Sequence, residues 1–341
     1  MKKALSVLIC VILSLSCVCI AFADSKPAGF GDYEHVFIIG IDGAGAAFSK
    51  VDSPNFDRIF ADNAYRYDAV TEYITTSAQN WGSILTGVDY ETHGMTNDST
   101  STGQPFRTSE SENHSIFYYV REAFPEEKLL SICHWHNINH GIIENDLGIK
   151  KVSRKSDPMV EDAIVEHIQS GYIPKLMFVQ LDDVDHAAHT YGGFSDEYYE
   201  AVKTADYRLG YIYDAIEEKG LMKNSLFIVV ADHGETDGGH GGQTKEESSA
   251  VLAVAGHNVN KIELGADAHN RDVSAIALYA LGIDQPGQFI SSVPDGLFGE
   301  SREKSVDKNP VEVKDKLWHD FLFAFVRFAN LIVGMFDFIV L

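Results

Sequence analysis

Cysteine is nearly absent from the main part of this sequence. The 341 residues include four cysteines, of which Cys10, Cys17 and Cys19 fall in an apolar N-terminal segment. Cys133 is left without a partner, so no internal disulfide can form in the remainder of the chain. Because Cys133 ends the apolar run 129–133, we expect it to be a small buried hydrophobe rather than a reactive thiol.

Basic residues are scarce as well. Lys and Arg total 27 against 50 Asp and Glu, which gives a formal net charge of −23, and no stripe rich in Lys or Arg offsets this excess. Such a surface repels the phosphate backbone of nucleic acids, so a nucleic-acid polymer is not expected as a partner. The sequence also lacks internal repeats and low-complexity blocks, and its length suffices for one large domain or two modest ones.

The first residues have the pattern of a targeting segment. Lys2 and Lys3 precede an apolar run over residues 5–20, and Ala21-Phe22-Ala23 fits a small-x-small cleavage site. This pattern is typical of a signal peptide. We therefore expect residues 1–23 to be removed and the protein to be exported, to an extracellular, cell-surface or periplasmic location.

The C-terminal segment combines a polar stretch with a long apolar one. Residues 300–316 are rich in Lys, Glu, Asp and Ser, and they are interpreted as a linker. Residues 317–341 are mostly apolar, and their few polar side chains, which include Arg327 and Asn330, fall near one stripe of a helix. Such a helix suits a membrane interface or a partner surface, or it closes the core of its own domain. A membrane span is disfavoured because Arg327 and Asn330 would lie near its middle.

The region between residues 35 and 283 alternates strand-like and helix-like runs. Apolar, β-branched runs predict strands at residues 35–41, 129–133, 176–181, 226–231 and 251–255. Helices are predicted to begin near Ser53, Ser77, Ile116, Asp157, Ser195 and Val273. This alternation predicts an α/β fold, with a mostly parallel central sheet covered by helices on both faces, for a catalytic domain over residues 24–299. The Ser/Thr-rich segment 97–112 is expected to be an exposed loop.

Acidic and imidazole side chains follow three of the predicted strands at the point where each strand ends. They are Asp42 after 35–41, Asp185 and His189 after 176–181, and Asp232, His233 and His240 after 226–231. Because ligand sites of such sheets lie beyond the carboxyl ends of the strands, we expect these side chains to meet at one edge. Carboxylates and imidazoles together bind hard or borderline cations, so the sequence predicts a metal site there.

A hydroxyl stands at the start of a predicted helix in the segment Thr75-Thr76-Ser77-Ala78-Gln79-Asn80. The unpaired N–H groups and positive dipole end of a helix N-terminus favour an alkoxide and a phosphate. Contact with a dication would further lower the pKa of the Ser77 hydroxyl, which makes it a candidate nucleophile. The alternative is that Ser77 is only a helix N-cap.

Five segments in a fixed order carry a resemblance to a known family. They are Ile39-Gly40-Ile41-Asp42-Gly43, the stretch 77–87 followed by Thr92-His93-Gly94, Asp185-x-x-x-His189 with Tyr191-Gly192, Asp232-His233-Gly234, and Gly239-His240-Gly241. The chain resembles the alkaline phosphatase superfamily, and most closely its type I phosphodiesterase/nucleotide pyrophosphatase branch. The matching region extends over about residues 35–290.

The resemblance implies roles for these residues. One metal would be surrounded by Asp42, Ser77, Asp232 and His233, and a second would be held by Asp185, His189 and His240. Two divalent cations about 4 Å apart are implied, with zinc favoured by the mixed ligands and manganese as the alternative. The implied reaction is attack by Ser77 on the phosphorus of a small-molecule phosphate ester, a phospho-serine intermediate, and hydrolysis by water from the opposite side.

Asn80 matches an asparagine that donates to a non-bridging phosphate oxygen in this branch, and the alternative is a local hydrogen bond in the first helical turn. The chain departs from the branch at Ser77, where Thr is common, and at Gln79, where Pro is common. Phosphodiester or nucleotide-type substrates are therefore expected, with a phosphomonoesterase as the alternative.

Other residues and other activities fit parts of the same pattern. Asp182 and Asp183 are near Asp185, but the four-residue spacing to His189 favours Asp185 as the ligand. His134, His136 and His140 match no motif and are expected to be surface or pocket-wall residues. A sulfatase is disfavoured because Pro and Arg are missing after Ser77. A membrane-associated transferase of phospho-headgroups remains open, because the apolar segment 317–341 could hold the enzyme at a membrane.

Overall fold

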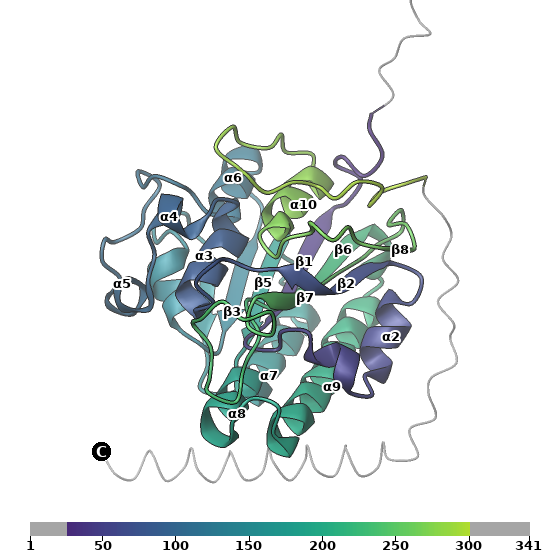
Figure 1. Ribbon diagram of the computed structural model, residues 1–341. Coiled ribbons are helices and arrows are strands. Elements are labelled where there is room, and N and C mark those ends of the chain that lie inside the picture. The colour runs from purple at the N-terminus through teal and green to yellow at the C-terminus, as the bar shows by residue number, and fades with distance from the viewer. Residues whose placement is uncertain (1–25, 301–341) are drawn as a thin grey trace, which may run out of the picture. The chain divides into compact units, whose positions relative to one another are not determined.

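The computed structural model describes residues 26–300, which form a sheet with helices on both sides (Figure 1). The strands are β1 (His35–Ile41), β2 (Ala64–Val70), β3 (Leu129–Cys133), β4 (Lys150–Ser153), β5 (Leu176–Leu181), β6 (Ser225–Val230), β7 (Ser249–Ala255) and β8 (Ile262–Glu263). Their order in the sheet is β4-β3-β5-β1-β6-β7-β2-β8. The five strands from β4 to β6 in this order are parallel to one another, and β7 runs antiparallel to both of its neighbours.

The helices are α2 (Pro54–Phe60), α3 (Ser77–Thr86), α4 (Tyr90–His93), α5 (Asn97–Thr102), α6 (Ile116–Ala123), α7 (Asp157–Gln169), α8 (Asp183–Tyr191), α9 (Asp196–Glu218) and α10 (Asp272–Ala280). Three short helical segments, η1 (Ala47–Lys50), η2 (Ile138–Ile142) and η3 (Met222–Asn224), connect these elements.

The two faces of the sheet bury alternate side chains of the same strands. On β1, Val36 and Ile38 pack in a cluster with residues of α3, α6 and α10, whereas Phe37, Ile39 and Ile41 pack in a cluster with residues of α2, α7 and α9. Side chains in a strand alternate between faces, so a central strand covered by helices on both sides is apolar throughout. This explains why the predicted strands were continuous apolar runs.

The expected fold class is confirmed by this arrangement. The strands predicted at 35–41, 129–133 and 176–181 match β1, β3 and β5, and Cys133 is buried as expected. The short strands β4 and β8 and the helix α8 were not predicted. The prediction of an exposed loop over 97–112 is wrong at its start, because the helix α5 begins at Asn97. Thr96 is the N-cap of this helix and forms a capping box with Ser99.

Several predictions fall on other parts of the chain. The signal peptide (1–23), nearly all of the linker (300–316) and the apolar helix (317–341) lie outside the described residues. Within residues 26–300, no helix combines the length and the apolar character needed to cross a membrane.

Candidate metal centre

The buried half of the candidate centre is formed where two neighbouring parallel strands end. Asp42 follows β1, while Asp232 and His233 come after β6. The Nε2 atom of His233 lies 3.5 Å from Asp42 Oδ1 and 3.3 Å from Asp232 Oδ2. Ser77 Oγ is 3.4 Å from the same nitrogen. We call Asp42, Asp232 and His233 the inner group.

Hydrogen bonds hold the two inner carboxylates in place and leave one oxygen of each facing His233. Asp42 Oδ2 accepts from Trp81 Nε1 at 2.8 Å and from Gln180 Nε2 at 2.9 Å. Asp232 Oδ1 accepts from the backbone N–H of Gly43 and of His233. Asp42 Oδ1 and Asp232 Oδ2 are buried and have no hydrogen-bond partner within residues 26–300. Buried polar atoms are almost always paired, so these oxygens fit a bound cation.

The pKa shifts of the inner group also fit a bound cation. Burial raises the pKa of Asp42 well above its usual value, and the charge of Asp232 raises it further. Burial likewise raises the pKa of Asp232, while burial and the neighbouring His240 lower the pKa of His233. A cation at this position would favour the charged carboxylates and the neutral imidazole, which are the ligand forms.

The second half of the candidate centre lies nearer the surface. Asp185 and His189 are four residues apart on α8, which places both on one face of the helix. Asp185 Oδ2 lies 3.4 Å from His189 Nε2, and Asp185 Oδ1 lies 3.4 Å from His240 Nε2. His240 Nδ1 donates to the Thr75 carbonyl at 2.7 Å, so its Nε2 faces the site, where it lies 3.1 Å from His189 Nε2. We call Asp185, His189 and His240 the outer group.

The two groups adjoin. The imidazole rings of His233 and His240 stack with their centroids 3.8 Å apart. Gly43 makes the close approach of β1 to α8 possible, since a Cβ atom there would lie 2.9 Å from Asp185 Cα, and its φ of +66° suits glycine. The structure therefore brings together all of the residues that the sequence suggested as ligands.

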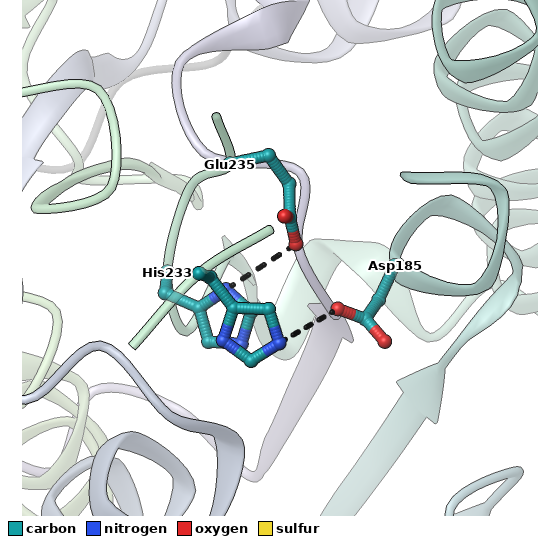
Figure 2. Close-up of side chains that lie close together, drawn as sticks. Asp185, His233 and Glu235 are labelled. Carbon is teal, nitrogen blue, oxygen red and sulfur yellow. Dashed lines mark ion pairs between the residues drawn. The ribbon is translucent and has the colours of Figure 1, made fainter. Parts of the chain in front are cut away.

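Glu235 is a member of the site that the sequence interpretation missed. Figure 2 shows Glu235 and Asp185 on opposite sides of the His233 imidazole, on different segments of the chain. Potential ligand atoms of Asp185, His233, Glu235 and His240 all lie within 4.8 Å of one another. Glu235 Oε1 is 3.8 Å from His233 Nδ1, and both carboxylate oxygens are buried without a hydrogen-bond partner in the described part of the chain. Burial and the charge of Asp185 raise the pKa of Glu235 to about 10. Its place directly after Asp232-His233-Gly234 was the available signal.

Ser77 and Asn80 occupy different environments at the start of α3. Thr76 is the N-cap residue and Ser77 is the first helical residue, so the N-cap alternative for Ser77 does not hold. Asn80 is fully buried: its Oδ1 accepts from the N–H of Glu72, and its Nδ2 donates to the carbonyls of Ile74 and Thr76. These bonds match the local alternative for Asn80 and hold the segment that leads into α3.

His134 belongs to a separate cluster at the N-terminal end of α8. Its Nδ1 lies 2.8 Å from Asp157 Oδ1, and Asp183 is close enough for the three to share a cation. However, the Asp157 carboxylate already accepts from the backbone N–H groups of Asp182 and Asp183. These hydrogen bonds give the cluster a structural role, which is to hold the first turn of α8 in place. His136 and His140 are exposed.

The family match over residues 36–247, together with the mostly parallel α/β sheet and the adjoining carboxylate–imidazole groups, places the chain in the alkaline phosphatase superfamily. Residues 36–247 match the type I phosphodiesterase / nucleotide pyrophosphatase family, and the chain belongs to that family. The family consists of phosphoryl-transfer enzymes that typically use two metal ions. Two clusters of the described residues fit that requirement: the inner group, and Asp185 with His240, Glu235 and the shared His233.

Solved structures share the fold at low sequence identity. Murine ectonucleotide pyrophosphatase/phosphodiesterase 5 is 13% identical, with a TM-score of 0.60 over 73% of this chain and 95% of that protein. The lipoteichoic acid synthase LtaP from Listeria monocytogenes is 14% identical, with a TM-score of 0.57 over 79% of this chain and 78% of that protein. These likenesses support the fold class.

Characterised relatives by sequence are much longer than this chain. GPI ethanolamine phosphate transferase 1 of Saccharomyces cerevisiae is 25% identical over 139 residues, which is 35% of this chain and 15% of the relative. The same transferase of Emericella nidulans is 25% identical over 179 residues, which is 45% of this chain and 19% of the relative. The matched region thus spans less than a fifth of either relative.

Proposed function

We propose that this protein is an exported two-metal phosphohydrolase that uses Ser77 as its nucleophile and acts on phosphodiester or nucleotide-type substrates. The observation that carries the proposal is the position of the Ser77 hydroxyl beside unpaired, buried carboxylate oxygens. Ser77 Oγ and the free oxygens of Asp42 and Asp232 all lie within 3.5 Å of His233 Nε2.

The inner group would hold one cation together with Ser77, and the outer group would hold the other. When bound, the cations supply positive charge that lowers the pKa of the Ser77 hydroxyl and neutralises the departing oxygen. Three imidazoles beside the carboxylates favour zinc, with manganese as the alternative.

The residues of this chain account for the covalent chemistry. A bond forms between Ser77 Oγ and phosphorus, the bond from phosphorus to the departing alcohol oxygen breaks, and the serine proton is released. Water then cleaves the phospho-serine and restores the hydroxyl. Ser77 begins α3, and the positive dipole end of this helix favours the negative charge of the phosphoryl group, although the N–H of Ala78 already donates to Asn97 Oδ1.

The serine variant Ser77→Ala tests this mechanism. We expect turnover of a nitrophenyl diester to fall by about a thousandfold or more while the metal content, measured by elemental analysis, is retained. Ser83→Ala, on the same helix but bonded to His93, is the matched control and should keep most of its activity. Full activity of Ser77→Ala would overturn the proposal.

Two alternatives share the same site. Comparing rates on a nitrophenyl monoester and a nitrophenyl diester separates a phosphomonoesterase from the proposed phosphodiesterase. A phospho-headgroup transferase is suggested by the names of the relatives, the GPI ethanolamine phosphate transferases. Transfer differs from hydrolysis only in the acceptor that reaches the phospho-serine. Labelled release from a diester, with and without an added alcohol acceptor, distinguishes the two.

Membrane contact through residues 317–341 is part of the proposal and rests on the sequence pattern alone. Deleting these residues should move the protein from the membrane to the soluble fraction with its turnover unchanged. Sedimentation of the truncated chain with membranes would contradict this anchoring role. Export is tested separately, by locating the full-length chain and a chain without residues 1–23 in fractionated cells.

A further inference from the structure

A cavity of about 450 Å³ lies beside the metal centre, at the carboxyl ends of β3, β4 and β5. Its lining includes His134, Trp135 and His136 after β3, Arg154 and Lys155 after β4, and Asp182 after β5. These strands are parallel and adjacent in the sheet, so the cavity opens at the same edge as the inner group. Neither the family match nor the motifs assign it a ligand.

Two basic side chains in this cavity have no acidic partner. Neither Arg154 nor Lys155 forms an ion pair with any residue from 26 to 300, and the Arg154 guanidinium donates only to the Ser153 carbonyl. The backbone N–H of Arg154 donates to the Cys133 carbonyl, and this bond holds the residues that follow β4 against the end of β3. In a chain with a net charge of −23, adjacent cations left unpaired in a cavity form a local site for an anion.

One buried side chain connects this cavity with the metal centre. Gln180 Oε1 accepts from the backbone N–H of Trp135 at 2.8 Å. Gln180 Nε2 donates to Asp182 Oδ1 at 2.8 Å and to Asp42 Oδ2 at 2.9 Å. The side-chain amide of Gln180 therefore contacts two lining residues of the cavity, Trp135 and Asp182, and also the Asp42 carboxylate of the inner group. Because β5 pairs directly with β1, the Asp182 side of the cavity lies about one strand spacing from Asp42. Arg154 and Lys155 follow β4, which is three strands from β1, so they lie roughly 14 Å from Asp42 across the sheet.

We propose that this cavity binds a second phosphate group, carried on the alcohol portion of the phosphodiester substrate. The proposal deepens the proposed function and rests on it. The Arg154 guanidinium suits the oxygens of a phosphate monoester, and Lys155 adds a point charge. The Trp135 ring offers an apolar wall for the carbon chain between the two phosphates, and Asp182 bounds the cavity on the side of the metal centre.

Two diesters test this specificity. Both are nitrophenyl phosphodiesters: in one the second alcohol is 1-octanol, and in the other it is 8-phospho-octanol, whose extended chain spans about three strand spacings. The parent enzyme should have at least about tenfold higher kcat/KM for the phosphate-bearing diester, the size of one charge-assisted contact. The double variant Arg154→Ala/Lys155→Ala should lose this preference and retain its rate on the octyl diester.

Lys219→Ala/Lys223→Ala is the charge-matched control, because these lysines precede β6 at the opposite edge of the sheet. It should keep the preference. Dissociation constants of both diesters for Ser77→Ala provide a measurement that needs no turnover. Equal affinity for the two diesters in that background, or a preference that survives Arg154→Ala/Lys155→Ala, would overturn the second phosphate site. A retained binding preference without hydrolysis of either diester would instead count against the proposed function.

Discussion

The inner and outer groups contain similar side chains but are built on different structures. In the inner group, Asp42, Asp232 and His233 follow strands in the middle of the sheet, and their side chains are at most 2% exposed. In the outer group, Asp185 and His240 are 14% and 8% exposed, and His189, on the surface helix α8, is 55% exposed. One half of the centre is therefore part of the core, and the other half is partly open to water.

This difference predicts two kinds of metal site. Strands paired on both sides fix the inner ligands, and buried hydrogen bonds from Trp81 and Gln180 hold one of them. The outer ligands depend on one surface helix and one loop, which are the kinds of segment that open most easily. We expect the inner cation to be retained tightly and the outer cation to exchange with solution.

The largest effect is expected from Asp232→Asn. The substitution keeps an acceptor for the N–H groups of Gly43 and His233 but removes an inner ligand charge. Turnover should fall by about a thousandfold or more, and excess metal should not restore it. The metal-free variant should be more stable than the metal-free parent, because one buried carboxylate has been neutralised.

Turnover, metal content and thermal unfolding with chelator measure these three outcomes. Asp237→Asn is the matched control, since Asp237 is exposed in the loop that follows the same motif. Recovery of turnover by excess metal would show that the inner group binds its cation no more tightly than the outer group does.

A smaller and reversible loss is expected from His189→Ala. At limiting metal, turnover should fall about tenfold to a hundredfold, because one outer ligand is missing while Asp185 and His240 remain. Raising the metal concentration should restore most of the activity. His186→Ala is the control, because His186 is exposed on the same helix. A loss that no metal concentration reverses would contradict the proposed difference between the groups.

The same comparison explains how far the sequence could predict the site. The inner residues were predictable because buried strands are continuous apolar runs, and the acids directly after them must lie at the sheet edge. The outer pair Asp185 and His189 was predicted from spacing, but α8 itself was not. Its nine residues include four Asp or His side chains and little apolar periodicity, so the 3.6-residue signal is weak.

The supporting side chains were harder to foresee. Trp81 and Gln180 are within a predicted helix and a predicted strand, where an apolar or structural role is the ordinary expectation. Their bonds to Asp42 depend on the pairing of β5 with β1 and on the packing of α3 over the sheet. Glu235 is next to a recognised motif, but only its burial against Asp185 and His233 distinguishes it from a solvent-exposed acid.

The smallest effect concerns the pH dependence of the metal-free chain. The pKa of Glu235 is about 10 in the folded protein, against an ordinary value of 4.5 when unfolded. The folded state therefore binds a proton that the unfolded state has lost, so stability falls as pH rises from about 4.5 toward 10. Between pH 7 and 7.5, unfolded histidines are already mostly neutral, and Lys151, whose folded pKa is about 8, is still mostly charged.

In that window Glu235→Gln should remove about 1.4 kcal/mol per pH unit from the slope of unfolding free energy against pH, measured by urea denaturation with chelator. Glu246→Gln, an exposed neighbour, should leave the slope unchanged. Added metal should flatten the slope of the parent, because a cation beside Asp185 and Glu235 favours charged carboxylates. An identical slope in the parent and in Glu235→Gln would mean that Glu235 is already ionised in the metal-free fold. Its buried oxygens would then require another source of positive charge between the two groups.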